Sequence, residues 1–262
     1  KPEYDEADAM GFFSMNEDYQ SYLEKRERIT EFLHKFVEIY GKKDDDGFRT
    51  TYNFSEKNDD QIVDIAKSMG ISFFRGNQSD VLDRYYQCAK EFSIKNIVRI
   101  SADAPLIDPT IVDKTIQVYE KSNFDYVNNF SKNRFPVGTE VEVFSFFALE
   151  KAWKNAIKPS EREHVTSYFY NNPDVFSIGH LENTSDLSNL HWTVDRAEDL
   201  EFVKTIYGGI SKRPILLDDI LRLLAERPSL LEINKKIDPR EGYKKSLSED
   251  LDPNNNAMKR DI

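Results

Sequence analysis

The sequence is poor in cysteine and in positive charge. Cys88 is its single cysteine, so the chain can form neither an internal disulfide bond nor a metal site built from several thiolates. There are 36 Lys and Arg against 47 Asp and Glu, which gives a formal net charge of −11. A protein that binds nucleic acid through its phosphates needs a cationic surface. We therefore expect no nucleic-acid partner, and an anionic ligand would need a local group of basic residues or a metal ion.

Long apolar runs are absent as well. No segment approaches the roughly 18 apolar residues that a membrane-spanning helix requires, and no signal-like segment opens the sequence. We therefore expect a soluble, cytoplasmic protein without a membrane partner. Hydrophobic residues make up 39% of the 262 residues and aromatic residues 13%, which is enough for a core and excludes disorder of the whole chain. The length suits one large or two small domains.

Predicted strands and helices alternate along most of the chain, which favours an α/β fold built from βαβ units around a mainly parallel sheet. Three parts are expected: an atypical helical segment over 1–47, an α/β domain over 48–210, and a helical extension with a flexible tail over 211–262. The predicted strands are 48–54, 71–74, 96–100, 124–128, 139–144, 175–178 and 191–194. The predicted helices are 19–40, 59–69, 80–92, 109–119, 160–170, 195–207 and 218–226. The apolar side of the last helix would serve a homodimer or pack on its own domain, and the sequence leaves both open.

Two carboxylates follow predicted strands, where open α/β sheets bind their ligands. Asp103 comes after the strand at 96–100, and Asp195 comes after the strand at 191–194. Two oxygen donors facing one crevice suit Mg²⁺, which needs few protein ligands and keeps positions for phosphate and water. The residues alone leave simpler interpretations open: Asp103 would only shape a turn, and Asp195 would only cap the next helix.

Seven segments, in order over about residues 52–250, carry a resemblance to a known family. They are FRG at 74–76 with DVLDRY at 80–85, VRISADAPLIDP at 98–109, DYV at 125–127, PVG at 136–138 with EVEVF at 140–144, REHVT at 162–166, WTVD at 192–195 with EDL at 198–200, and EGYKKSL at 241–247. In these segments the chain resembles the nucleotide-sugar cytidylyltransferases of the spore-coat polysaccharide and acylneuraminate type.

The resemblance implies a Rossmann-like nucleotidyltransferase fold that transfers CMP from CTP to an acidic, sialic-acid-like sugar and releases pyrophosphate, for surface polysaccharide or glycan synthesis. It matches Asp103 and Asp195 to the two metal-associated carboxylates of the family, so both are expected to be catalytic and to bind Mg²⁺. The barrier of such a transfer is mostly charge and positioning, which a metal ion and cationic side chains supply.

Three further residues are candidates for binding the nucleotide. Arg75 and Arg84 flank the segment that leads into the predicted helix at 80–92, and the alternative is that both are surface ion-pair partners. Ala102 stands where the family usually has glycine, directly before Asp103, and adds a methyl group where the ligand approaches the backbone.

Four other residues are candidates for binding the sugar. Glu140 and Glu142 alternate with valines and so share a face; they bind sugar hydroxyls or only solvate an edge strand. Arg162 and His164 lie just inside the predicted start of a helix, where backbone N–H groups favour an acidic sugar's carboxylate. The alternatives are that Arg162 pairs with Glu161 and that His164 is an ordinary half-buried histidine.

One element of the family pattern is missing: residues 1–47 contain no loop of the form G-S-x-R-L-P-G-K, whose glycines and basic residues hold the triphosphate. Three explanations stay open. The loop lies upstream of Lys1 in a longer protein; or Lys25, Arg26 and Arg28 substitute for it; or the chain is a catalytically silent relative that binds nucleotide or sugar or scaffolds a partner. A glycosyltransferase would need a D-x-D motif, and the segment SAD at 101–103 lacks it.

Overall fold

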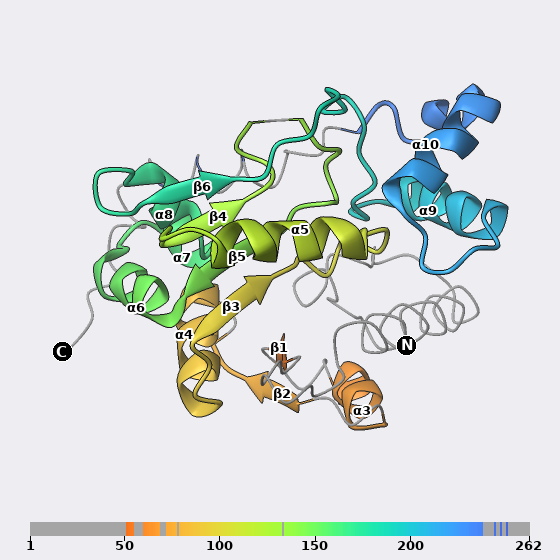
Figure 1. The fold of residues 1–262 in the computed structure, drawn as a ribbon. Coiled ribbons are helices and arrows are strands. Elements are labelled where there is room, and N and C mark those ends of the chain that lie inside the picture. The colour runs from red at the N-terminus through yellow and green to blue at the C-terminus, as the bar shows by residue number, and fades with distance from the viewer. Residues whose placement is uncertain are drawn as a thin grey trace.

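The computed structural model describes residues 51–54, 60–68, 72–77, 79–132, 134–237, and the single residues 244, 247 and 250 (Figure 1). The predicted helix at 19–40 and the predicted tail after residue 251 lie outside them. The described elements are β1 (Thr51–Phe54), α3 (Asp60–Ser68), β2 (Ser72–Arg75), α4 (Val81–Glu91), β3 (Asn96–Arg99), α5 (Pro109–Glu120), β4 (Tyr126–Asn128), β5 (Glu142–Ser145), α6 (Phe146–Asn155), α7 (Pro159–Glu163), α8 (Ser167–Asn171), β6 (Ile178–His180), α9 (Ala197–Gly209), α10 (Leu217–Glu226) and the 3-10 helix η2 (Pro228–Glu232).

The central sheet has the strand order β3-β5-β4-β6, and its middle strand β5 runs against the other three. Val143 of β5 is paired with Val98 of β3 on one side and with Val127 of β4 on the other. Strands β1 and β2 form a separate parallel pair. The prediction of an α/β fold with a mainly parallel sheet is confirmed, and the reversed β5 is what the sequence pattern did not indicate.

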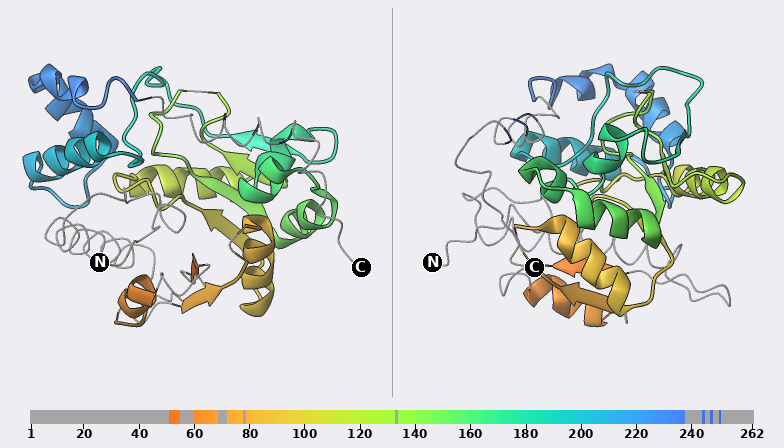
Figure 2. Two further views of the ribbon diagram at one scale, coloured as in Figure 1. Left: turned by 180° about the vertical axis from the view of Figure 1, so that it is seen from behind. Right: turned by 90° about the vertical axis from the view of Figure 1, so that its left-hand side faces the viewer.

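Helices cover both faces of this sheet (Figure 2). Because successive side chains of a strand point to opposite faces, Val98 and Val143 pack against α5, and their neighbours Ile97 and Phe144 pack against α4, α6 and α8. Burial of each large apolar side chain contributes about 1.5–3 kcal/mol to folding. The alternation in β3 and β5 therefore fixes the register between the strands, because a slip of one residue would exchange the two faces.

A third apolar cluster joins α9 and α10 at the end of the sheet that lies on the right in Figure 1. Trp192 and Ile206 lie in its centre, and Ile220 and Leu223 bring α10 into it. The predicted division of the chain at residue 210 falls inside this cluster and stays a prediction.

Several predicted elements are corrected by the structure. The predicted helix at 160–170 is two short helices, α7 and α8, interrupted where the buried Val165 has a φ of 58°. A β-branched residue is strained in this left-handed region, so the interruption is held by tertiary packing. The predicted strand at 191–194 forms only one bridge, from His191 to Val137. Helix α6 was missed because it follows β5 without a loop, with Ser145 as its cap.

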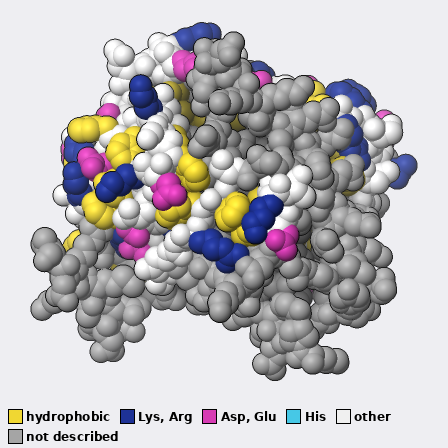
Figure 3. Space-filling view, turned by 90° about the horizontal axis from the view of Figure 1, so that it is seen from below, with side chains coloured by type: hydrophobic (Ala, Val, Ile, Leu, Met, Phe, Trp, Pro, Cys, Tyr) yellow, Lys and Arg dark blue, Asp and Glu magenta, His cyan; other side chains and the backbone are white. Residues whose placement is uncertain are grey.

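The surface seen from below carries Lys and Arg beside Asp, Glu and apolar side chains, with no field of one sign among the residues drawn in colour (Figure 3). None of the helices in the described part of the chain has both the length and the apolar character needed to cross a membrane.

Candidate functional site

Three loops meet at the edge of the sheet where the parallel strands end. Asp103 follows β3, residues 136–141 precede β5, and residues 191–195 lead into α9. Because β5 is antiparallel, its first residue lies at the same edge as the last residues of β3 and β4. Backbone hydrogen bonds join the loops: Val194 N–H donates to the carbonyl of Asp103 at 2.9 Å, and Trp192 N–H donates to that of Val137 at 2.9 Å.

Gly138 allows the close approach of two of these loops. Its φ is 94°, and a Cβ atom there would lie 2.7 Å from the backbone nitrogen of Thr193 and 2.9 Å from the carbonyl carbon of Trp192. Only glycine meets both conditions without displacement of the backbone. Asn129, which follows β4, fixes the same loop: its side-chain amide donates to the carbonyl of Thr139 at 2.7 Å and accepts from Val141 N–H at 2.8 Å.

The carboxylates carried by these loops repel one another. The exposed Asp195 has its pKa raised to about 6 by partial desolvation and by the negative charges of Asp103 and Asp199. Burial raises the pKa of Asp103, and a hydrogen bond with the side chain of Ser101 and the positive charge of Arg99 only partly oppose this. Burial also raises the pKa of Glu140 to about 7, against hydrogen bonds from backbone N–H groups that include Gly138. Acid groups with pKa values raised in this way are typical of functional sites, because a bound cation or ligand relieves the repulsion.

The alternative interpretation of Asp195 as a simple helix cap is wrong. The cap of α9 is Arg196, and the carboxylate that accepts the backbone N–H groups there belongs to Asp199. The carboxylate of Asp195 does not take part in this cap, and it interacts with the side chain of Thr193. For Asp103 both interpretations remain, since it lies in a turn in which Ala104 N–H donates to the carbonyl of Ser101.

The carboxylates of Asp103 and Asp195 are the oxygen ligands that this edge of the sheet offers to Mg²⁺. In the described ranges, no group of three His, Cys, Asp or Glu side chains is arranged to hold a metal ion. Asp103 and Asp195 provide two carboxylates whose charges interact, on loops joined by a hydrogen bond. Such a pair fits Mg²⁺, which usually takes one or two carboxylates and completes its shell with water and substrate phosphates. The predicted Mg²⁺ site is compatible with this geometry and stays a prediction.

Glu142 occupies a different environment from Glu140. It is 1% exposed, and its carboxylate accepts hydrogen bonds from the hydroxyl of Tyr126 at 2.6 Å and from the guanidinium of Arg99. The alternative that these glutamates solvate an edge strand is wrong for Glu142, since β5 lies between β3 and β4. Its predicted role in sugar binding stays a prediction. Arg99 and Tyr126 were missed by sequence reasoning, although an arginine inside an apolar strand was a usable signal.

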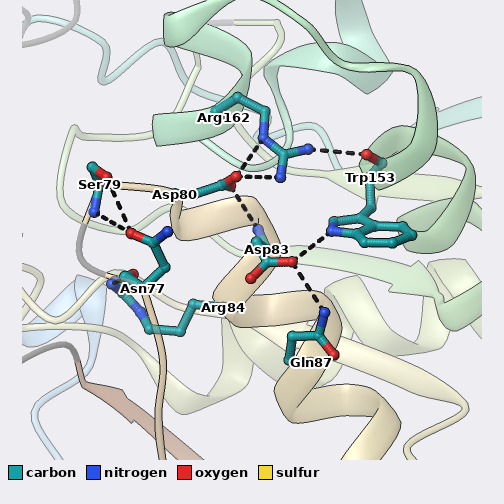
Figure 4. Close-up of polar contacts among 8 residues, drawn as sticks. All are labelled: Asn77, Ser79, Asp80, Asp83, Arg84, Gln87, Trp153 and Arg162. Carbon is teal, nitrogen blue, oxygen red and sulfur yellow. Dashed lines mark hydrogen bonds and ion pairs between the residues drawn. The ribbon is translucent and has the colours of Figure 1, made fainter. Parts of the chain in front are cut away.

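Arg162 pairs with Asp80 across the structure and not with Glu161 (Figure 4). Its guanidinium, 5% exposed, donates from Nε to Asp80 Oδ2 at 3.0 Å and from Nη1 to the carbonyl of Trp153 at 3.0 Å. Asp80 also caps α4 by accepting from Asp83 N–H at 2.8 Å. Asp83 in turn accepts from the indole of Trp153 at 2.7 Å. These contacts fasten α4 to α6 and α7.

His164 is the C-cap of α7 and not a residue of its first turn, which corrects its predicted place. It is half-buried, and burial lowers its pKa. The first turn of α7 already has a carboxylate from the chain itself, because Asp250 accepts from the backbone N–H of Ser160 at 2.9 Å and from its hydroxyl at 2.6 Å. The predicted sugar contacts of Arg162 and His164 stay predictions.

The three candidates for nucleotide binding differ in how far their side chains are buried. Arg84 is buried and does not lie on the surface, and its Nη1 donates to the carbonyl of Asn77 at 2.8 Å (Figure 4). Arg75 ends β2 opposite Phe54 and is half-buried. Ala102 packs against the cluster around Trp192. Their contacts with a nucleotide stay predictions.

Three comparisons place this geometry among known proteins. A protein of Methanocaldococcus jannaschii named uncharacterized protein MJ1063 is 36% identical over 211 residues, which are 80% of this chain and 84% of that protein. The spore coat polysaccharide biosynthesis protein SpsF of Bacillus subtilis is 28% identical over 181 residues, 66% of this chain and 73% of SpsF. A solved cytidylyltransferase of Leptospira borgpetersenii superposes with a TM-score of 0.72 and 28% identity, covering 79% of this chain and 87% of that one.

A family model matches a much longer part of the chain than any single motif covers. The model, described as Cytidylyltransferase, spans residues 56–237, from before α3 to beyond η2, and includes all three loops that meet at the sheet edge. The chain therefore belongs to the cytidylyltransferase family.

Proposed function

We propose that this protein transfers CMP from CTP to an acidic, sialic-acid-like sugar and releases pyrophosphate, as a step in the synthesis of surface polysaccharide or glycan. The nucleotidyl-transfer class follows from family membership. Support for the polysaccharide context comes from the likeness to SpsF, whose name describes spore coat polysaccharide biosynthesis.

The observation that carries the proposal is the pairing of Asp103 and Asp195. The two residues come from loops joined by the hydrogen bond between Val194 and Asp103, and the charge of Asp103 raises the pKa of Asp195. They would hold Mg²⁺, which supplies positive charge to the triphosphate and to the pyrophosphate that leaves.

The remaining roles fall to side chains around this pair. Glu140, with a pKa raised to about 7 and next to Asp103, keeps its proton at mildly acidic pH and can donate it in a hydrogen bond to a sugar oxygen. Arg75 and Arg84 are proposed to neutralise nucleotide phosphates, and Ala102 to approach the ribose. Arg162 and His164 are proposed to bind the carboxylate of the acidic sugar from the side of α7, and Glu142 of β5 is proposed to bind its hydroxyls.

Pyrophosphate release tests the proposal directly. The protein is assayed with Mg²⁺, with CTP or UTP, and with acidic and neutral sugars, and we expect release only with CTP and an acidic sugar. Asp103→Asn and Asp195→Asn should abolish release, and Asp186→Asn, which alters an exposed carboxylate bonded to Ser188, should not. Release that survives in both site variants would refute the metal assignment.

A second candidate function rests on the missing phosphate loop. A catalytically silent relative would bind nucleotide or sugar, or scaffold a partner, without turnover. No pyrophosphate release from any nucleotide, together with saturable CTP binding in calorimetry, would favour this candidate over the transferase.

A further inference from the structure

Asp199 lies directly behind the loop that carries Asp195. It is 0% exposed, and one of its oxygens, Oδ2, accepts the backbone N–H of Asp195 at 3.3 Å and that of Arg196 at 3.1 Å. These two N–H groups belong to the residues at which the chain turns from the 191–195 loop into α9. The position of the Asp195 backbone is therefore tied to a single buried carboxylate.

The other oxygen of Asp199 is held from the opposite side. Oδ1 accepts from the side-chain amide of Asn234 at 2.9 Å and lies 3.3 Å from Nε2 of His191. The amide of Asn234 also lies 3.1 Å from the same ring nitrogen, so the three side chains contact one another. Asn234 is itself buried and follows η2, 35 residues after Asp199.

The comparison with α10 indicates that this arrangement is more than a helix cap. Asp219 is the third residue of α10, as Asp199 is of α9, and it accepts the backbone N–H of Leu216 at 3.2 Å. Its other partners are exposed cations, Lys212 at 2.7 Å and Arg222 at 3.6 Å. Asp199 instead contacts two side chains that are not exposed cations, those of the half-buried His191 and the buried Asn234.

We propose that Asp199 and Asn234 are positioning residues, which hold the Asp195 carboxylate in the geometry that binds the metal ion. The proposal rests on the function proposed above. It gives the segment that follows η2 a part in the site: Asn234 fixes Asp199, and Asp199 fixes the backbone of Asp195. Residues that orient metal ligands in this indirect way commonly contribute 10- to 100-fold to metal affinity.

The test uses the full chain and Mn²⁺ alone, whose free form is measured by electron paramagnetic resonance. Asp199→Asn and Asn234→Ala should each raise the dissociation constant for Mn²⁺ by about 10- to 100-fold. Asp219→Asn, the matched change in α10, should lower the melting temperature and leave the dissociation constant unchanged. Hydrogen exchange of the peptide 191–199 should accelerate in the first two variants only. Asn234→Ala keeps the test valid if Asp199→Asn does not fold.

Two results would overturn the inference. The first is Mn²⁺ binding at parental affinity in the folded Asp199 and Asn234 variants, which would make both residues purely structural. The second is a parent chain that binds no Mn²⁺ at all, which would also refute the metal site. A parent that binds Mn²⁺ but releases no pyrophosphate would refute only the transferase function, and the positioning of Asp195 would still be decided by the affinities.

Discussion

Two regions of the molecule contain pairs of aspartates in opposite electrostatic environments. Around α4, the carboxylates of Asp80 and Asp83 accept hydrogen bonds from Arg162 and from the indole of Trp153 (Figure 4). At the sheet edge, Asp103 and Asp195 lie close enough for one charge to raise the pKa of the other. In the first region each carboxylate has a partner within the chain, and these contacts stabilise the fold. The second accumulates negative charge, which costs stability and suits a cation.

The largest expected effect is on catalysis at the sheet edge. Asp195→Asn should lower the rate of pyrophosphate release by about 10²–10³-fold or more, because the electrostatic support of the reaction is lost. Its melting temperature should stay within a few degrees of the parent, since Asp195 is exposed and does not cap α9. A steady-state assay and a thermal melt measure both. If Asp195→Asn keeps its activity, or if it unfolds, then Asp195 does not serve catalysis rather than stability, and the comparison of the two regions fails.

The next effect is on stability and belongs to the other region. Arg162→Ala should lower the free energy of unfolding by about 3–5 kcal/mol, because it leaves Asp80 without its partner in a largely buried position. Lys154→Ala, which removes an exposed ion pair with Glu150, should cost less than about 1 kcal/mol. Urea unfolding followed by fluorescence compares them. An equal loss of unfolding free energy in the two variants would show that the buried ion pair stabilises the protein no more than the exposed one does.

A backbone change should disturb the sheet edge by an intermediate amount. Gly138→Ala should cost about 1–3 kcal/mol of stability, because alanine is strained at a φ of 94° and meets the backbone of Thr193. Gly208→Ala in α9 has open space around its added methyl group and should stabilise by about 0.5–1 kcal/mol. Chemical denaturation measures the change in unfolding free energy of each variant, which should have opposite signs. A Gly138→Ala variant that is more stable than the parent would contradict the close contact of the loops.

The last effect concerns pH and is no larger than that of Gly138→Ala. Burial raises the pKa of Glu140 from its model-compound value of 4.5 to about 7. The stability linked to its protonated form is therefore fully present below pH 4.5 and is lost as the pH rises through 7. Glu140→Gln should remove this loss, so that the variant gains about 1–3 kcal/mol over the parent at pH 8 relative to pH 4.5. Urea unfolding without metal at both pH values measures this. If the free energies of unfolding of the variant and the parent differ by the same amount at both pH values, the raised pKa of Glu140 is contradicted.

Local features of the fold could be predicted because their causes lie within a few residues. The start of α5 is an example: Asp108 accepts the N–H of Thr110 at 2.7 Å and Pro109 takes the first helical position, as the sequence indicates. The end of α7 could not be predicted, since Val165 adopts a left-handed conformation only under contacts from distant residues. The same holds for Arg162, whose partner Asp80 is 82 residues away.

The candidate site divides in the same way. The positions of Asp103 and Asp195 after apolar segments, and the resemblance in the flanking motifs, predicted a role for these two acids, and the structure brings their loops together. The sequence did not identify Asp199 as the carboxylate that accepts the backbone N–H groups at the start of α9, nor its contact with Asn234, because Asp195 is also placed to cap that helix.

The sequence by itself determined the family, the alternation of strands and helices, and the two acidic residues, because these are properties of short segments and their order. Only the tertiary structure decided that β5 runs antiparallel, that Glu142 is enclosed by Tyr126 and Arg99, and that three loops meet at one edge. The physical reason is that hydrogen bonds and repulsion between charges depend on distances of a few ångströms, and folding sets those distances between residues far apart in the chain.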